Sequence, residues 1–246
     1  MVTGEHRVWL AGLMALTMAV CPACDQLVKY GDGHGVASDR PTGTGKAKPS
    51  TPGSSTAMAS PGGGASGAPS ADACTKVSAP LVEVPLAAGV STGSEPQIRV
   101  PKPAGWNRLA SLDSKLIRYT MRNEALAANG FTPTAVVTLD SRPGAVLAAD
   151  VFEQELHEVT SQLGATDLHM TDIRVCGLPG KRATYMAPAM GQLPPRPVKV
   201  VSAVITANGQ TFDVSVTIQT TEPDNPTYQA DSEDILNGLQ VLPPPS

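Results

Sequence analysis

A long tract without large apolar side chains confines the folded part of this chain to its C-terminal two thirds. From Gly31 to about Ser70 the sequence consists mostly of Gly, Ser, Thr, Pro and Ala. Such a tract cannot offset the conformational entropy lost on ordering. It is typical of a flexible tether, whose end-to-end distance reaches about 35–40 Å at this length. We therefore predict a stalk over residues 24–72 and one folded domain over residues 73–246.

The residues before the stalk predict export. Arg7 is followed by an apolar segment over residues 8–20. This segment has the length of a signal-peptide core and is too short to span a bilayer. The sequence therefore indicates an exported protein.

Two cysteines at the end of the apolar segment predict a lipid anchor. A bacterial lipoprotein signal is cut just before a cysteine that carries a diacylglycerol. Cys24 follows Ala23, a small residue that suits the peptidase, whereas Cys21 follows the bulkier Val20. We predict a lipoprotein signal peptide over residues 1–23 and lipidation at Cys24, with Cys21 as the alternative. The protein would then be held on the extracytoplasmic face of the cell membrane.

The predicted domain contains two further cysteines, Cys74 and Cys176. Disulfides persist in exported proteins. We predict that these two residues pair, and the alternative is that each is a small buried thiol.

The charge pattern argues against nucleic-acid binding. The formal net charge is −4, and the sequence has no Lys/Arg cluster interleaved with aromatic residues. We expect no nucleic-acid partner.

The C-terminal half of the domain predicts an antiparallel hairpin. Apolar and polar residues alternate from Phe212 to Gln219, which is typical of a strand with one face toward solvent. Asn208-Gly209 marks a tight turn before it. The preceding strand, residues 198–206, is apolar at adjacent positions and is therefore predicted to be central. Further strands are predicted at 97–100, 116–121, 135–139, 173–176 and 182–186, the last two joined by a loop over 177–180.

A helix is predicted over residues 145–163. Its apolar residues recur at spacings of three and four: Ala148, Phe152, Leu156, Val159 and Leu163. Three acidic residues are interpreted as lying outside that stripe: Glu153, Glu155 and Glu158.

A second helix is predicted to begin at Asn225, its N-cap, with Pro226 in the first turn. It is expected to bury Tyr228, Ile235 and Leu239. Strands in short hairpins with helices between them predict the α+β class, a mostly antiparallel sheet flanked by helices.

The order of these features resembles the mycobacterial LpqN/LpqT-type lipoproteins. The shared features are an export signal ending in cysteine, a Thr/Ser/Pro-rich stalk, a strand running into Val100-Pro-Lys-Pro-Ala-Gly-Trp106, a later helix, the Asn-Gly turn and the closing Asp234-Ile-Leu-Asn-Gly-Leu-Gln-Val241. The resemblance covers about residues 94–242. It implies a PsbP/Mog1-like fold on a lipid-anchored envelope protein, in a family with no enzymatic activity established as a whole.

One short motif matches a hydrolase signature. Gly89-Val-Ser91-Thr-Gly93 fits G-x-S-x-G, in which a strand enters a strained turn that opens directly into a helix. Here Pro96 and a strand follow, so we interpret Ser91 as a loop residue. His157 and His169 are interpreted as a solvated helix side chain and a loop or strand-edge side chain, because neither begins a series with metal-ligand spacing. We predict no catalytic residue, no metal and no cofactor.

Aromatic residues are the candidates for a ligand site, because they make up only 4% of the chain. Trp106 lies at a strand end, where it can be either a core residue or the wall of an apolar cleft. In the second case Tyr119, Tyr185 and Phe152 would line the cleft with it, between the sheet and the first helix.

These observations predict a binding protein rather than an enzyme. The expected partners are the membrane through the lipid anchor, and either an envelope lipid or glycolipid or a membrane-transport protein. The alternatives are a structural or protein-interaction module on the cell surface, and a serine esterase that uses Ser91.

Overall fold

The computed structural model describes residues 69–245. The predicted signal peptide, both lipidation candidates Cys21 and Cys24, and the predicted stalk up to residue 68 lie outside the described residues. No helix within residues 69–245 is long and apolar enough to cross a bilayer.

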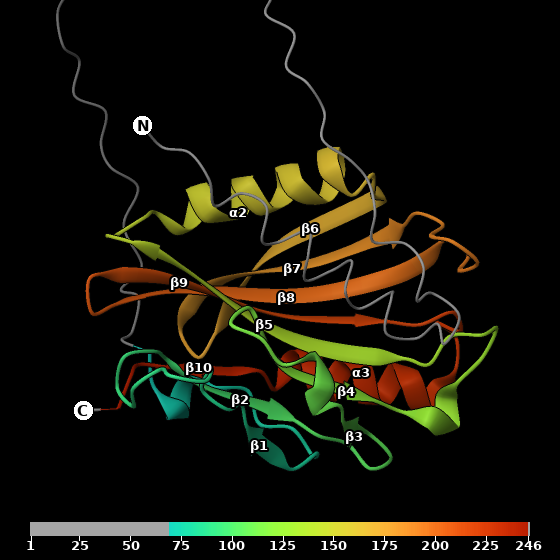
Figure 1. Cartoon of the computed structure of the whole chain (residues 1–246), viewed down its shortest axis with the longest axis horizontal. Helices are drawn as coiled ribbons and strands as arrows, with labels where there is room; N and C mark the ends of the chain where they lie inside the picture. Colours follow the sequence, from blue (N-terminus) through green and yellow to red (C-terminus); the bar gives the residue numbers. More distant parts are fainter. Residues whose placement is uncertain (1–68, 246) are drawn as a thin grey trace, which may run out of the picture. The chain divides into compact units, whose positions relative to one another are not determined.

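The largest element is a seven-stranded sheet in the order β3-β4-β5-β9-β8-β7-β6 (Figure 1). Its strands are β3 (Asn107–Arg108), β4 (Ile117–Arg122), β5 (Thr134–Pro143), β6 (Thr166–Val175), β7 (Leu178–Ala187), β8 (Arg196–Ala207) and β9 (Gln210–Gln219). All neighbouring pairs are antiparallel. The predicted central position of β8 is confirmed, since it lies between β7 and β9.

The turn between β8 and β9 is the one predicted from Asn-Gly. Asn208 has φ 52° and Gly209 has φ 72°. Two successive residues in the left-handed region match the right-handed twist of the strands that they join.

The loop between β6 and β7 was predicted over residues 177–180, and this position is wrong. Only Cys176 and Gly177, with φ values of 51° and 86°, join the two strands. Gly180 lies inside β7 rather than in a loop, because an added Cβ would approach the Ser202 carbonyl oxygen on β8 to 2.6 Å. This glycine therefore permits close packing of two strands and does not mark a turn.

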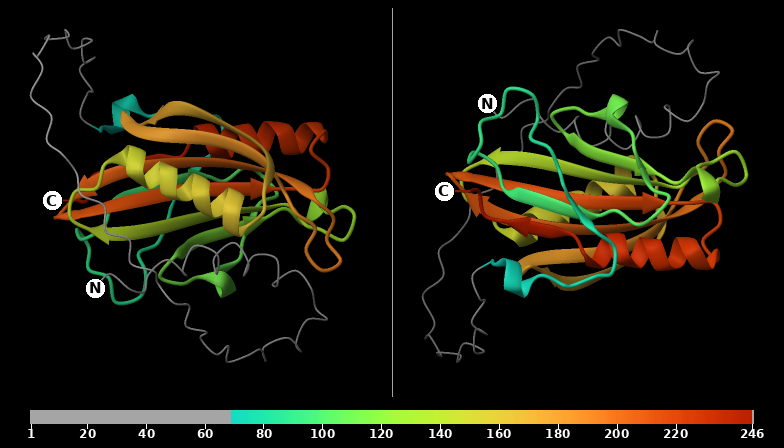
Figure 2. Two further views of the ribbon diagram at one scale, coloured as in Figure 1. Left: turned by 90° about the horizontal axis from the view of Figure 1, so that it is seen from above. Right: turned by 90° about the horizontal axis from the view of Figure 1, so that it is seen from below.

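One face of the main sheet is covered by α3 (Pro226–Asn237) and a small antiparallel sheet in the order β1-β2-β10 (Figure 2). The small sheet comprises β1 (Leu81–Glu83), β2 (Gln97–Pro101) and β10 (Gln240–Leu242). Asn225 is the N-cap of α3 as predicted, and its side chain accepts hydrogen bonds from the backbone N–H groups of Thr227 and Tyr228.

The layer between α3 and the main sheet is the principal apolar core. Its largest fully buried side chains include Trp106, Met121, Phe212, Ile218, Tyr228, Ile235, Leu236 and Leu239. The predicted burial of Tyr228, Ile235 and Leu239 is confirmed.

The opposite face carries α2 (Ala148–His157), which continues into a π-helical turn, Glu158–Gln162 (Figure 2). The regular helix is shorter than the predicted 145–163. Glu155 is buried and Leu156 is exposed, which reverses their predicted environments. The cause is that Val151, Phe152 and Glu155 form the side of α2 that packs on the sheet.

The predicted disulfide is present: Cys74 and Cys176 are bonded across 102 positions of sequence. The bond joins the start of the described chain to the turn between β6 and β7. Cys74 follows a short 3₁₀ turn, Ala71–Ala73, and two further 3₁₀ turns are Ala110–Leu112 and Glu124–Leu126.

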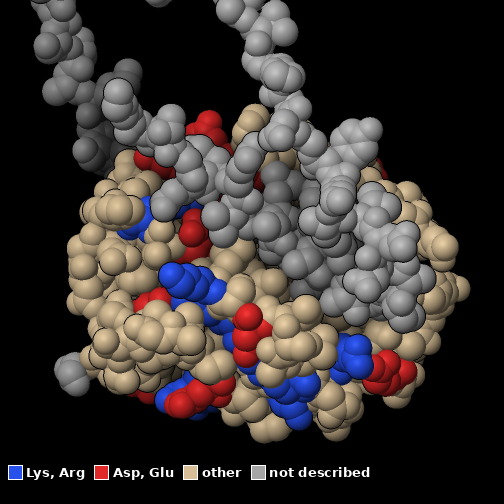
Figure 3. Space-filling view, viewed as in Figure 1, with Lys and Arg blue, Asp and Glu red and all other residues tan. Residues whose placement is uncertain are grey.

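The predicted α+β class, a mostly antiparallel sheet flanked by helices, is confirmed. On the described part of the face seen in Figure 3, basic and acidic side chains lie next to one another. Several oppositely charged side chains of the domain form ion pairs, for example Arg108 with Asp113.

Candidate functional site

The four aromatic residues predicted to line one cleft lie on two different faces of the main sheet. Trp106 and Tyr119 belong to the core beneath α3. Tyr185 packs in a cluster on the other face, and Phe152 lies on α2 itself. Because the sheet separates the two pairs, no single cleft uses all four residues.

Trp106 has the environment of a core residue. Its side chain is fully buried, and its Nε1 donates a hydrogen bond of 2.8 Å to Oδ2 of Asp231 on α3. An indole with its polar atom paired in this way holds one element against another. The sequence leaves open whether Trp106 is a core residue or the wall of an apolar cleft. The structure shows that it is a core residue.

The structural context of a nucleophile elbow is not found at Ser91. The residue is exposed in a loop, and its carbonyl oxygen accepts hydrogen bonds from the backbone N–H and the hydroxyl of Ser94. The next regular element is β2, not a helix. His157 lies beside Ser161, and His169 lies on the edge strand β6. Within residues 69–245 no group of three or more His, Cys, Asp or Glu side chains is arranged to hold a metal.

The structure instead brings polar and apolar side chains together beneath α2. We call the space between α2 with its π turn and strands β7, β8 and β9 the α2 seam. Its defining residues are Glu155, Leu163, Tyr185, Arg196, Val200 and Thr217. Of these, the sequence analysis proposed only Tyr185 as a site residue.

Two glycines and one threonine set the position of the α2 segment. Gly144, with φ 81°, and Gly164, with φ 72°, flank it. The Thr211 hydroxyl on β9 donates a hydrogen bond of 2.8 Å to the Gly144 carbonyl and accepts one of 2.9 Å from the Val146 N–H. The chain is thus tied to the sheet before α2 begins, which explains why the helix starts later than predicted.

A pair of carboxyl groups lies at the centre of the seam. Glu155 projects from α2 and accepts a hydrogen bond of 3.3 Å from the Ser202 hydroxyl on β8. Asp213, on β9, faces Glu155 and is 2% exposed. The alternation in β9 placed Asp213 on the predicted solvent face, and it is buried because α2 packs over that face.

Burial determines the protonation of this pair. Removal from water raises the pKa of Asp213 from its ordinary 3.8 to about 7, although the nearby Glu155 carboxyl and the charge of Arg142 act in the opposite direction. Burial, and then the negative charge of Asp213, raise the pKa of Glu155 well above its ordinary 4.5. The pair therefore retains a proton near neutral pH.

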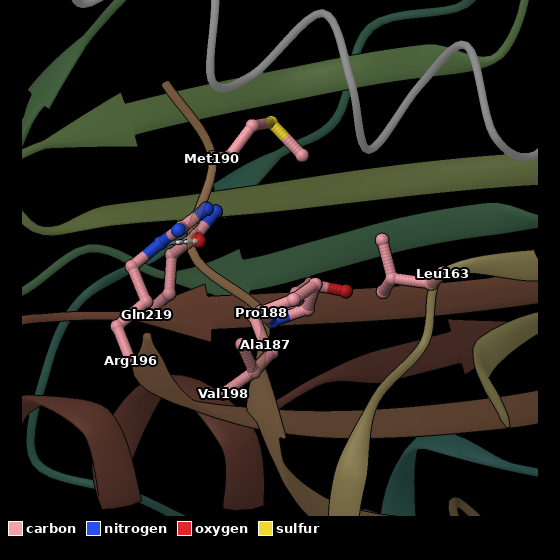
Figure 4. A pocket seen from close by; sticks show the side chains of 8 residues that line it. Leu163, Ala187, Pro188, Met190, Arg196, Val198 and Gln219 are labelled. Atoms are coloured by element: carbon pink, nitrogen blue, oxygen red, sulfur yellow. Dashed lines mark hydrogen bonds between the residues drawn. The ribbon is translucent and has the colours of Figure 1, made fainter. Parts of the chain in front are cut away.

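Two small cavities remain in the seam. One, of about 30 Å³, lies between Glu155, Val159, Tyr185 and Val200. The other, of about 10 Å³, lies between Leu163, Val198, Arg196 and Gln219 (Figure 4). Both are lined by Thr217, so they lie next to each other along the seam. Cavities of this size hold about one or two water molecules.

The arrangement suits binding of a molecule that is partly apolar. Apolar side chains, including valine, leucine, alanine and methionine, line more than half of the seam, and polar groups are placed at fixed positions among them, which is the usual composition of small-molecule sites. A ligand longer than a few atoms requires the α2 segment to move away from the sheet. Gly144 and Gly164 flank this segment, and a glycine backbone is less restricted than that of other residues.

The sequence analysis missed Glu155, Arg196 and Asp213 as site residues, and only Glu155 had a sequence pattern that indicates burial. Glu155 is three positions after Phe152 and four before Val159, so it falls on the apolar stripe by spacing. Arg196 and Asp213 carried no comparable signal, because their burial depends on elements distant in sequence.

No protein-family model and no curated protein sequence matches this chain. Among solved structures, it is similar to LpqN of Mycobacterium tuberculosis, described as involved in cell envelope biogenesis, with a TM-score of 0.52 and 18% identity over 66% of this chain and 92% of that one. It is also aligned with the Ran-binding protein Mog1p of Saccharomyces cerevisiae, with a TM-score of 0.39 and 15% identity over 67% of this chain and 96% of that one. The resemblance to LpqN is thereby confirmed at the level of the fold.

Proposed function

We propose that this protein is a cell-envelope lipoprotein whose domain binds an amphiphilic envelope molecule, a lipid or glycolipid, in the α2 seam, and does no chemistry on it. One observation carries the proposal: the two faces of the same sheet are filled differently. The layer between the main sheet and α3 is packed with large apolar side chains, whereas the layer beneath α2 contains two cavities and the buried ionisable groups Glu155, Asp213 and Arg196. A further pocket, of about 220 Å³, lies against β1 and β2 of the small sheet.

The contrast matters because a buried ionisable group destabilises a fold unless it is fully paired. A domain that needed α2 only for stability would be better served by aliphatic residues at Glu155 and Asp213. Their presence between α2 and the sheet supports a face that opens to a ligand.

The proposed location rests on the chain's N-terminal sequence. An apolar leader that ends in Cys21 and Cys24 supports lipid anchoring in the cell envelope. The structural similarity to LpqN, a protein described as involved in cell envelope biogenesis, agrees with this location. An anchored domain meets lipids and glycolipids at high effective concentration.

The test is to fill the seam and measure binding. Ala183 on β7 lines the larger cavity, so Ala183→Leu should occupy that space. Its neighbour Thr184 points to the other face of β7, and Thr184→Leu is the matched control. Binding of decyl maltoside below its micelle concentration is measured by calorimetry on the purified full chain.

We expect Ala183→Leu to weaken binding by at least tenfold and Thr184→Leu to leave it within about twofold, since the leucine adds three carbon atoms and even a smaller loss of space is felt in a packed site. Equal binding by both variants would place the ligand elsewhere. Absence of binding in the unmodified chain, to this glycoside and to extracted envelope lipids, would favour a protein partner such as a membrane-transport protein.

A further inference from the structure

Arg196 is a buried cation without an anionic partner. Its side chain is 2% exposed. Its Nε donates a hydrogen bond of 2.7 Å to Oε1 of Gln219, but its buried Nη1 makes no hydrogen bond. The other buried arginine of residues 69–245, Arg118, forms an ion pair of 2.6 Å with Glu95.

The contrast with Arg118 shows what is missing. Buried charges in proteins are paired, because removing an ion from water costs several kcal/mol. Burial lowers the pKa of Arg196, the direction expected for a cation that no carboxylate compensates. Phe131 lies 5.2 Å from the guanidinium carbon and covers one face of the group. The Gln219 amide is neutral and bonds only Nε, and the Phe131 ring covers only one face of the guanidinium group. The N–H donors at the end of the group, which lie in its plane, therefore remain free.

The position of these donors is defined by the smaller cavity of the α2 seam. Arg196 and Gln219 lie side by side at its wall, and Leu163, Val198 and Met190 surround the same space (Figure 4). Apolar side chains continue from there along the seam through Val200 toward Val159. A cation at one end of an apolar path is complementary to a molecule with an anionic head and a hydrocarbon chain.

The fork of a guanidinium matches a planar carboxylate through two parallel hydrogen bonds. We propose that Arg196 binds the carboxylate of a long-chain fatty acid or of a lipid that carries a free carboxyl group, with the chain lying beneath α2. This inference rests on the proposed amphiphile binding and adds its chemical class.

The test compares three probes with the same chain and different heads: decanoate, decanol and decyl phosphate. Decanoate and decyl phosphate are titrated below their micelle concentrations, and decanol below its solubility limit, into the purified full chain at pH 7.5, by calorimetry. The variants are Arg196→Met, which keeps the apolar stem, and Arg196→Lys, which keeps a charge without the fork. Arg122→Met is the matched control. Arg122, the last residue of β4, forms an ion pair of 2.8 Å with Glu124 and does not line the seam.

We expect the unmodified chain to bind decanoate at least tenfold more tightly than decanol. Arg196→Met should abolish this preference while it still binds decanol, Arg196→Lys should retain only part of it, and Arg122→Met should leave it unchanged. If Arg196→Met does not fold, the lysine variant decides the matter.

Four results would overturn the assignment. Equal affinity for decanoate and decanol in the unmodified chain would refute the role of Arg196 and leave amphiphile binding intact. An unchanged preference in a folded Arg196 variant would do the same. Tighter binding of decyl phosphate than of decanoate would assign the site to phosphate. Failure of every probe to bind would refute the proposed function itself, and the inference with it.

Discussion

The carboxyl pair beneath α2 makes a quantitative prediction about the pH dependence of stability. Asp213 is 2% exposed, and burial raises its pKa from 3.8 to about 7. An acid whose pKa is raised by folding binds its proton more tightly in the native state. Its contribution to stability is therefore complete below about pH 4 and is lost as the pH rises through about 7.

The size of this loss follows from the pKa difference. At 1.36 kcal/mol for each tenfold change in proton affinity, the raised pKa corresponds to about 4 kcal/mol, an upper figure because Asp213 and Glu155 titrate together. Asp213→Asn removes the ionisation and keeps the shape. We expect this variant to gain about 2–4 kcal/mol relative to the unmodified chain between pH 5 and pH 8.

The assay is urea unfolding followed by circular dichroism at several pH values from 5 to 8.5. Asp172→Asn is the control, since Asp172 is an exposed carboxylate paired with Lys181 at the edge of the sheet. The free energy of unfolding of the Asp172→Asn variant should change with pH in the same way as that of the unmodified chain. If the free energy of unfolding of Asp213→Asn shows the same pH dependence as that of the unmodified chain, or if this variant is less stable at pH 8, the pair is not held protonated by burial.

Four further predictions concern other parts of the chain. Replacing Cys74 and Cys176 with serine should lower the free energy of unfolding by about 2–5 kcal/mol, measured in urea, and neither thiol of the unmodified protein should react under denaturing, non-reducing conditions. Asn225→Ala should lower the stability by about 1 kcal/mol in the same assay, whereas Asn225→Asp should preserve it. Trp106→Phe should cost about 1–3 kcal/mol, because it leaves a carboxylate of α3 without its donor. Mass spectrometry of the mature protein should find a diacylated Cys24 at the N-terminus, and a lipidated Cys21 or an unmodified N-terminus would contradict this.

Local signals in the sequence predicted the parts of the fold that depend on neighbouring residues. The β8–β9 hairpin follows from the alternation around Asn208-Gly209, and the start of α3 follows from Asn225 and its proline. Strands β1 and β10 have only three residues each and exist because they pair with β2, with Val241 opposite Ile98. No local pattern identifies such strands, since their partners lie far away in sequence.

The candidate site was less predictable than the fold. Sequence reasoning selected aromatic residues because they are few in this chain, and two of them, Trp106 and Tyr119, lie in the core instead. The polar residues of the seam were interpreted as solvent-facing, because alternation in β9 distinguishes two faces and does not show which one is covered. Glu155 could have been recognised from its spacing alone. Arg196 could not, because its burial depends on Phe131 and Gln219 from other elements.

Alternate residues of β9 belong to the apolar core on one face of the strand and to the proposed binding seam on the other. Val214, Val216 and Ile218 face α3 and are completely buried in the apolar core. Asp213 and Thr217, between them, face α2. Substitutions in the second set change the seam without removing apolar contacts from the core, and the energetic effects of sites without shared contacts are close to additive. The α3 face can therefore maintain the fold while residues of the proposed binding site in the α2 seam are changed.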